Sequence, residues 1–462
     1  MRSSAAAQLF AGAGSARLRS GAEAPRTMII RRAARRPHLR APLFAARTSQ
    51  PARRTASARG PWRCSSAKER WTEAYGTRSS ENGGVRGSLG AMVDLGQIAR
   101  AIGDEYLRSR ATTPFQRNAL RDIQRCRTEE MGSLYAVCDR CGAEHLQFRS
   151  CQNRSCPRCQ AGAREAWLEA RERELLPVPY FHVVFTVPEA LNSIALYCPE
   201  FFYAELLRAA GKALLDVGRQ KLHVQLGCMT VLHTWGQNLS LHPHAHCVVP
   251  GGGLSEDRTR WMGLRSSKYL LPVKVLASRF RTLLCRAVRA AAKDGRLDRV
   301  PTEIGLTAAI RKASEQNWVV YAKPPFGGPE QVLDYIARYT HRIAISNRRI
   351  VSFANGQVTF KWRDYADNNR RKLMVLNAIE FMRRFLMHVL PDRFVRIRYF
   401  GLLANAKRRR NIALARLLLG AATPRPRPER RMLVVLCPIC AAARATACDS
   451  RLLRSPPTSE AA

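Results

Sequence analysis

The sequence has 462 residues and a formal net charge of +42, with 77 Lys and Arg against 35 Asp and Glu. This length suffices for two or three domains and at least one sizeable core. A charge this large indicates a polyanionic partner, and nucleic acid is the first expectation because each neutralised phosphate releases condensed counterions. An anionic membrane surface is the competing interpretation of this charge. The chain lacks a run of roughly eighteen apolar residues, which argues against a spanning helix. We expect DNA and not a membrane as the partner.

Residues 1–91 are rich in Arg, Ala, Ser and Gly and lack a sustained apolar period. This composition predicts a disordered extension. An Arg-rich, acid-poor segment is also typical of a transit peptide, but the length of this one favours a mis-assigned start. We therefore expect the protein to begin at Met92.

The order of the elements that follow predicts the fold class. Apolar residues recur at helical spacing over residues 95–127, and Pro114 divides them into two helices. After a charged helix at 161–176, a strand, a helix and two further strands follow in that order, which predicts an α+β domain with an antiparallel sheet and helices on one side. The predicted units are an extension at 1–91, a helical and zinc-binding domain at 92–176, a catalytic domain at 177–420 and a Pro/Arg-rich tail at 421–462.

The 14 cysteines include two Cys-x2-Cys pairs in the N-terminal part of the chain. Each pair presents two thiolates from one tight turn, which predicts a closed structural zinc site rather than disulfides. The predicted ligands are Cys138, Cys141, Cys156 and Cys159, with Cys151 and His145 as spare ligands. Arg158 lies between the two cysteines of the second pair and Arg154 lies just before them, where both side chains suit contacts to phosphate.

Three histidines alternate along a predicted strand just before an apolar run, at positions 242, 244 and 246. Because successive side chains of a strand point to opposite faces, they share one face while Ala245 and Cys247 point toward a core. Two imidazoles at this spacing can bind one divalent cation, and either Gln237 or His233 of the preceding strand and turn supplies a third ligand. The alternative is a polar strand face with incidental histidines.

Tyr335 and Tyr339 lie four residues apart on a predicted helix, so their rings project from one face. Two tyrosines at this spacing usually belong to a core. Here Arg338, His341 and Arg342 make the surroundings cationic, which favours contacts to DNA.

Together these motifs resemble the insertion sequence 91 family of transposases, the two-tyrosine rolling-circle class of bacterial mobile elements. The resemblance covers roughly residues 92–420 and rests on the cysteine segment 150–160, the strand 181–188, and the segments 232–253, 321–342 and 362–365. It implies that His244 and His246 form a His-hydrophobic-His metal motif on a compact antiparallel nuclease sheet. It also implies that Tyr335 and Tyr339 are the nucleophiles, and the cations after Tyr339 rank that residue first.

The implied activity is a DNA transposase that nicks and rejoins single-stranded DNA through a 5′-phosphotyrosine intermediate. The resemblance implies Mg2+ or Mn2+ at the histidines, Zn2+ at the cysteines, single-stranded element ends and target DNA as partners, and a bacterial cytoplasm, at the nucleoid when acting, as location. A rolling-circle replication initiator or relaxase would use the same motifs. A non-catalytic, zinc-dependent DNA-binding protein would need only the cysteines.

Overall fold

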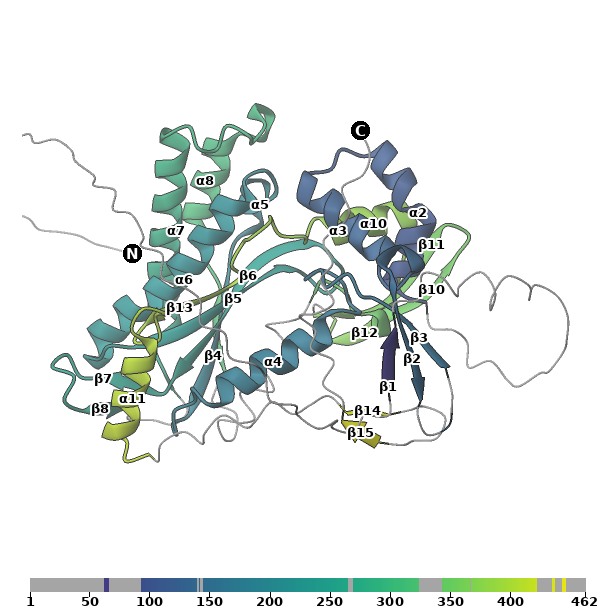
Figure 1. Ribbon diagram of the computed structural model, residues 1–462. Helices are drawn as coiled ribbons and strands as arrows, with labels where there is room; N and C mark the ends of the chain where they lie inside the picture. Colours follow the sequence, from purple (N-terminus) through teal and green to yellow (C-terminus); the bar gives the residue numbers. More distant parts are fainter. Residues whose placement is uncertain are drawn as a thin grey trace, which may run out of the picture. The chain divides into compact units, whose positions relative to one another are not determined.

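The computed structural model (Figure 1) describes residues 62–65, 93–138, 141, 144–264, 269–323, 343–365, 367–421, 434–436 and 443–445. The predicted helix with Tyr335, Arg338, Tyr339, His341 and Arg342 lies outside these residues. The helices are α2 (Leu95–Ser109), α3 (Pro114–Arg125), α4 (Gln160–Glu172), α5 (Asn192–Tyr197), α6 (Pro199–Leu222), α7 (Val273–Lys293), α8 (Leu306–Glu315), α10 (Ala378–Leu386) and α11 (Arg408–Leu418). No helix among the described residues is long and apolar enough to cross a membrane.

Five antiparallel strands form the central sheet in the order β13-β5-β6-β4-β9. They are β4 (Tyr180–Thr186), β5 (Gly227–Trp235), β6 (Leu241–Pro250), β9 (Val320–Lys323) and β13 (Ile397–Gly401). The predicted α+β class with an antiparallel sheet is therefore confirmed. The register places His244 between Thr186 and His233, and places His246 between Val184 and Val231.

One face of this sheet packs against α6 and α7 to form the main core. Ala245 and Cys247 are fully buried in it, as the alternation along the histidine strand predicts. Helix α6 approaches the sheet closely at Gly211, where an added Cβ would lie 2.5 Å from the ring of Phe400. The histidines therefore lie on the opposite face.

Helices also cover part of that opposite face, so the prediction of helices on one side is wrong. Met229, Val231 and Val248 of the sheet are buried together with Ile412 of α11, and Trp167 of α4 packs against them. This cluster covers one end of the face, since Met229 pairs with Val248 while His233 pairs with His244. The end with the histidines adjoins it.

A second core joins the start of the described chain to its C-terminal part. Helices α2 and α3 pack with α10 and with the three-stranded sheet β10 (Ile350–Ala354), β11 (Gln357–Asp364) and β12 (Arg370–Asn377). Asp94 and Thr113 cap α2 and α3 in capping boxes, which satisfy amides that the first turns leave unpaired. Gln116 of α3 donates to the Leu386 carbonyl of α10 at 3.0 Å.

Short strands complete the described fold. They are β1 (Trp62–Ser65), β2 (Ser133–Cys138), β3 (Glu144–Phe148), β7 (Gly252–Leu254), β8 (Trp261–Gly263), β14 (Val434–Leu436) and β15 (Ala443–Ala445). Strand β1 pairs with β2, although the composition of residues 1–91 predicted no regular structure.

Candidate metal centres

Three imidazoles meet at the end of the central sheet. His233 of β5 and His244 and His246 of β6 place their candidate ligand nitrogens within 4.8 Å of one another. Two imidazole nitrogens that are each bound about 2.1 Å from one cation lie at most about 4.2 Å from each other. Modest rotations of the rings would therefore bring the three nitrogens within bonding distance of one ion. The structure thus brings the predicted ligands His244 and His246 together with His233, one of the two residues predicted as a third ligand.

Two further aromatic residues hold this cluster in place. His182 of β4 stacks on His246 with ring centroids 5.0 Å apart, and its Nε2 lies 2.8 Å from His246 Nδ1. Trp235 stacks on His233 at 4.5 Å. His182 has no histidine motif around it in the sequence, and only the pairing of β4 with β6 brings it to the cluster.

Burial keeps part of the cluster neutral. Desolvation lowers the pKa of His244 to about 4, and desolvation together with nearby Lys323 and His244 lowers the pKa of His182 to about 4. Both rings are therefore uncharged near pH 7 and retain a lone pair on one nitrogen. A neutral imidazole is the form that binds a metal.

Gln237 lies outside this imidazole cluster. It sits in the turn after β5, and its amide Nε2 donates to the Tyr365 hydroxyl at 3.1 Å. A register irregularity between His233 and Trp235 separates the turn from the regular ladder. His242 is exposed, and its carbonyl oxygen lies 2.7 Å from His244 Nδ1. The structure thus brings His233, and not Gln237, next to His244 and His246, and the backbone carbonyl of His242 contacts the ring of His244.

The second centre consists of four cysteine thiols, Cys126, Cys151, Cys156 and Cys159. Cys126 follows α3 directly, and the other three lie on the loop that leads into α4. The sulfur of Cys159 lies 3.6 Å from those of Cys126 and Cys151. The Cys126 and Cys156 sulfurs are 3.7 Å apart. A tetrahedral zinc with bonds of about 2.3 Å requires sulfurs about 3.8 Å apart, so the four thiols fit zinc closely.

The charges in this cluster also favour a cation. Hydrogen bonds from the thiols of Cys151 and Cys156 hold the pKa of Cys159 well below its usual range. The hydrogen bond with Cys151 lowers the pKa of Cys156, but the hydrogen bond to Cys159 and burial outweigh it and raise that pKa. Without a metal, the protein therefore stabilises one cysteine as a thiolate and disfavours the deprotonation of the cysteines beside it. A divalent cation removes this opposition, because zinc binds cysteine as thiolate.

This set differs from the predicted zinc ligands in two members. Cys156 and Cys159 are common to both sets, while Cys126 and Cys151 stand where the spacing pointed to Cys138 and Cys141. Cys141 is exposed, and the side chain of Cys138 lies outside the described part of the structure. Cys126 lies between two arginines without a Cys-x2-Cys partner, so spacing gives no signal for it.

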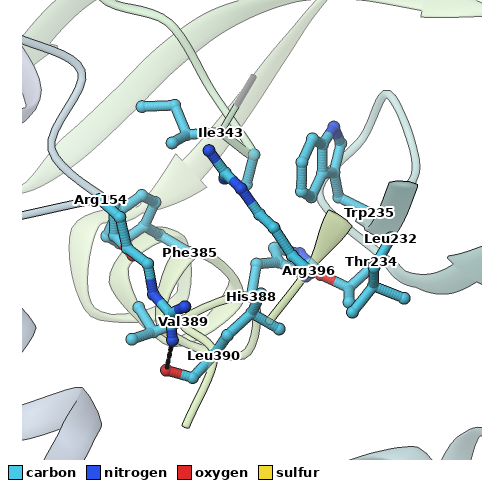
Figure 2. A pocket seen from close by; sticks show the side chains of 12 residues that line it. Arg154, Leu232, Thr234, Trp235, Ile343, Phe385, His388, Val389, Leu390 and Arg396 are labelled. Atoms are coloured by element: carbon cyan, nitrogen blue, oxygen red, sulfur yellow. Dashed lines mark hydrogen bonds between the residues drawn. The ribbon is translucent and has the colours of Figure 1, made fainter. Parts of the chain in front are cut away.

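Arg154 is engaged inside the protein instead of facing a phosphate (Figure 2). Its guanidinium donates to the carbonyl of Leu390 at 3.0 Å, the bond drawn in Figure 2. It also donates to the carbonyl of Phe394 at 2.7 Å and to that of Pro391. Three carbonyls suit the fixed fork of an arginine. Arg158 likewise pairs with Asp94, the N-cap of α2. Both side chains thus link the cysteine loop to other elements.

A small pocket lies beside Arg154, between the cysteine loop, β5 and α10 (Figure 2). Arg396 reaches into it, near Trp235, and its Nη2 lies 3.3 Å from Gln160 Oε1. Burial and the neighbouring Arg154 lower the pKa of Arg396 to about 10. Ile343 and Ala344 also line the pocket and directly follow the segment with the two tyrosines.

Comparisons with known proteins identify the family of the chain and a zinc-binding domain in its N-terminal part. Residues 227–411 match a family model described as a putative transposase, and residues 98–187 match one described as a transposase zinc-binding domain. The chain is 45% identical over 345 residues to the putative transposase y4qJ of Sinorhizobium fredii (strain NBRC 101917 / NGR234), which covers 72% of this chain and 86% of that relative.

It is 26% identical over 330 residues to the transposase for insertion sequence element IS801 of Pseudomonas savastanoi pv. phaseolicola, over 68% of this chain and 78% of the relative. No solved structure matches the chain. The chain belongs to the insertion sequence 91 family of transposases and carries the family's N-terminal zinc-binding domain.

Proposed function

We propose that this transposase cleaves and rejoins single-stranded DNA through a covalent 5′-phosphotyrosine, with a divalent cation held by His233, His244 and His246. The observation that carries the proposal is the convergence of three imidazoles on one sheet face inside the segment that matches the transposase family. Three nitrogen ligands suit Mn2+ better than Mg2+, which prefers oxygen ligands and keeps its waters.

The cation would act as a Lewis acid that withdraws charge from the scissile phosphate. The chain supplies the rest of the reaction. Tyr339, with Tyr335 as the second nucleophile, attacks phosphorus through its phenolic oxygen, and the bond from phosphorus to the 3′ oxygen breaks. The phenolic proton passes to that oxygen, which leaves as a 3′ hydroxyl. Because phenol has a pKa near 10, attack needs help from cations such as Arg338, His341 and Arg342.

The second metal centre, the four-cysteine cluster, would support this reaction without taking part in it. Four thiolates from Cys126, Cys151, Cys156 and Cys159 would hold a structural zinc and would leave no ligand position for substrate. Arg154 and Arg158 then tie the cysteine loop to residues 390–394 and to α2. The four cysteines, when they hold zinc, would thereby fix the loop that Arg154 connects to the segment before β13.

The test is the covalent adduct itself. Purified protein is incubated with Mn2+ and a 3′-labelled single strand that carries an element end, and the mixture is resolved on a denaturing gel. The label should migrate with the protein, and digestion with peptide mapping should place the nucleotide on Tyr339. An adduct on Tyr335 would reverse the order of the nucleophiles. A strand that is cut without any adduct would contradict the tyrosine mechanism.

His182 should act as a positioning residue for the cation. Its contact with Nδ1 of His246 leaves Nε2 of that ring as the nitrogen for the metal. Loss of such an outer partner typically lowers metal affinity or activity about 10–100-fold. We therefore expect His182→Leu to raise the Mn2+ concentration needed for half-maximal cleavage by about that factor, while His182→Gln restores part of it. The same Mn2+ dependence in His182→Leu and wild type would contradict the role.

A further inference from the structure

The three-stranded sheet β10–β12 has one buried and one exposed face. Val358 and Phe360 of β11 are fully buried in the second core. Their neighbours Lys361 and Arg363 point the other way and are exposed. The alternation continues on β12, where Leu373 is 60% and Val375 is 53% exposed. The exposed face therefore carries cations and large apolar side chains side by side.

Two arginines on this face lie directly opposite each other. Arg363 of β11 pairs in register with Arg371 of β12. Like charges at such a position destabilise a sheet. Among the described residues neither arginine forms an ion pair, and the nearby carboxylates Asp364 and Asp367 bond to Lys372 on the buried side at 2.8 and 2.9 Å. An anionic partner would offset the repulsion between the two arginines.

The apolar side chains of the face narrow the choice of anion. Leu373 lies opposite Lys361 and Val375 lies opposite Thr359, so the apolar strip adjoins the cations. Tyr365, 67% exposed, follows at the end of β11 and offers a ring for stacking. A duplex presents only phosphates to such a surface, whereas a single strand presents phosphates together with the apolar faces of its bases. The combination fits a single strand.

The structure also ties this face to the histidine cluster. The Tyr365 hydroxyl accepts a hydrogen bond from Gln237 in the turn that follows the strand with His233. Arg349 donates to the Lys361 carbonyl at 2.8 Å and to the Gln237 carbonyl. This end of the sheet is therefore anchored to the turn that follows β5, the strand that carries His233.

We infer that the exposed face of β10–β12 binds the single DNA strand adjacent to the cleavage site, with Arg363 and Arg371 on phosphates and Leu373, Val375 and Tyr365 against bases. This inference rests on the proposed function, because it takes the histidine cluster as the point of cleavage. Binding without cleavage tests it separately from the tyrosine chemistry.

The first test measures the affinity for fluorescent oligothymidylate at several salt concentrations. Each phosphate contact on a single strand adds about 0.7 to the slope of log K against log salt, so Arg363→Gln with Arg371→Gln should lower that slope by about 1.4. If the two proteins bind equally at 1 M salt, this difference in slope makes the double variant bind about 25-fold more weakly than wild type at 0.1 M salt. The control is Arg219→Gln with Arg311→Gln, which removes the same charge from exposed positions of α6 and α8 and should keep the slope. Equal slopes in the two double variants would overturn the inference.

Two single variants separate binding from folding and from other partners. Arg371→Glu places a carboxylate opposite Arg363, so we expect an equal or higher melting temperature together with weaker DNA binding. Leu373→Asn should weaken binding without a change in salt slope. Unchanged DNA binding in both variants would overturn the inference. A change in the oligomeric state of the protein, without a change in its DNA affinity, would also overturn it and would identify the face as a protein interface.

Discussion

Replacing His244 or His246 with alanine should abolish DNA cleavage while leaving single-strand binding nearly intact. Both residues lie in the imidazole cluster, and the cation there is expected to contribute several kcal/mol to the transition state as a Lewis acid. Since each 1.36 kcal/mol is a factor of ten in rate, we expect a loss of about 1,000-fold or more. Binding rests on dispersed Lys and Arg, so its affinity should change little.

His242→Ala is the matched control, because it removes an exposed imidazole from the same strand but keeps the carbonyl that contacts His244. It should cleave at a rate close to wild type. His233→Ala should resemble the other two cluster variants, whereas Gln237→Ala should not. Single-turnover cleavage of a labelled strand at saturating Mn2+ measures all five. Normal rates in the variants of His244 and His246 would refute the metal site.

Strands β4, β5 and β6 of the central sheet were predictable because they follow simple rules of composition and periodicity. Residues 181–187 and 244–249 are β-branched or aromatic, or alternate regularly, and β4 and β6 form there. Strands β12 and β13 were missed. In β12 three consecutive cations precede four consecutive apolar residues, so the segment shows no alternation of polar and apolar residues. Strand β13 has only five residues, with Arg398 among them, and a segment this short resembles a loop in the sequence.

The histidine cluster was predictable only in part. The alternation within β6 needs no tertiary information, since neighbouring positions of one strand determine which side chains share a face. His182 and His233 join the cluster through the register of β4 and β5 against β6, which the sequence does not specify. Arg154 and Arg158 show the same limit, because their carbonyl and carboxylate partners lie on distant segments.

The four-cysteine cluster gives the sharpest remaining prediction. Cys126→Ser should abolish stoichiometric zinc, since it removes one of the four sulfurs that meet at tetrahedral spacing. Structural zinc sites of zinc-finger peptides bind with about 10–16 kcal/mol, which equals or exceeds the roughly 5–15 kcal/mol that stabilises a typical domain. We therefore expect the region around the second core, in which Cys126 and Cys156 are buried, to unfold locally. Elemental analysis measures the metal, and limited proteolysis measures the unfolding.

Cys141→Ser separates the structural cluster from the set predicted by spacing. Cys141 is exposed and lies outside the cluster, so its variant should retain zinc and resist protease as wild type does. Cys156 belongs to both ligand sets, so Cys156→Ser should lose zinc in either case and shows the zinc content expected for complete loss. Zinc retained in Cys126→Ser but lost in Cys141→Ser would restore the pairing of Cys138 and Cys141 with Cys156 and Cys159. The physical reason to expect the opposite is the sulfur spacing. Three pairs of sulfurs in the four-cysteine cluster lie 3.6–3.7 Å apart, and thiolates this close repel each other unless a cation lies between them.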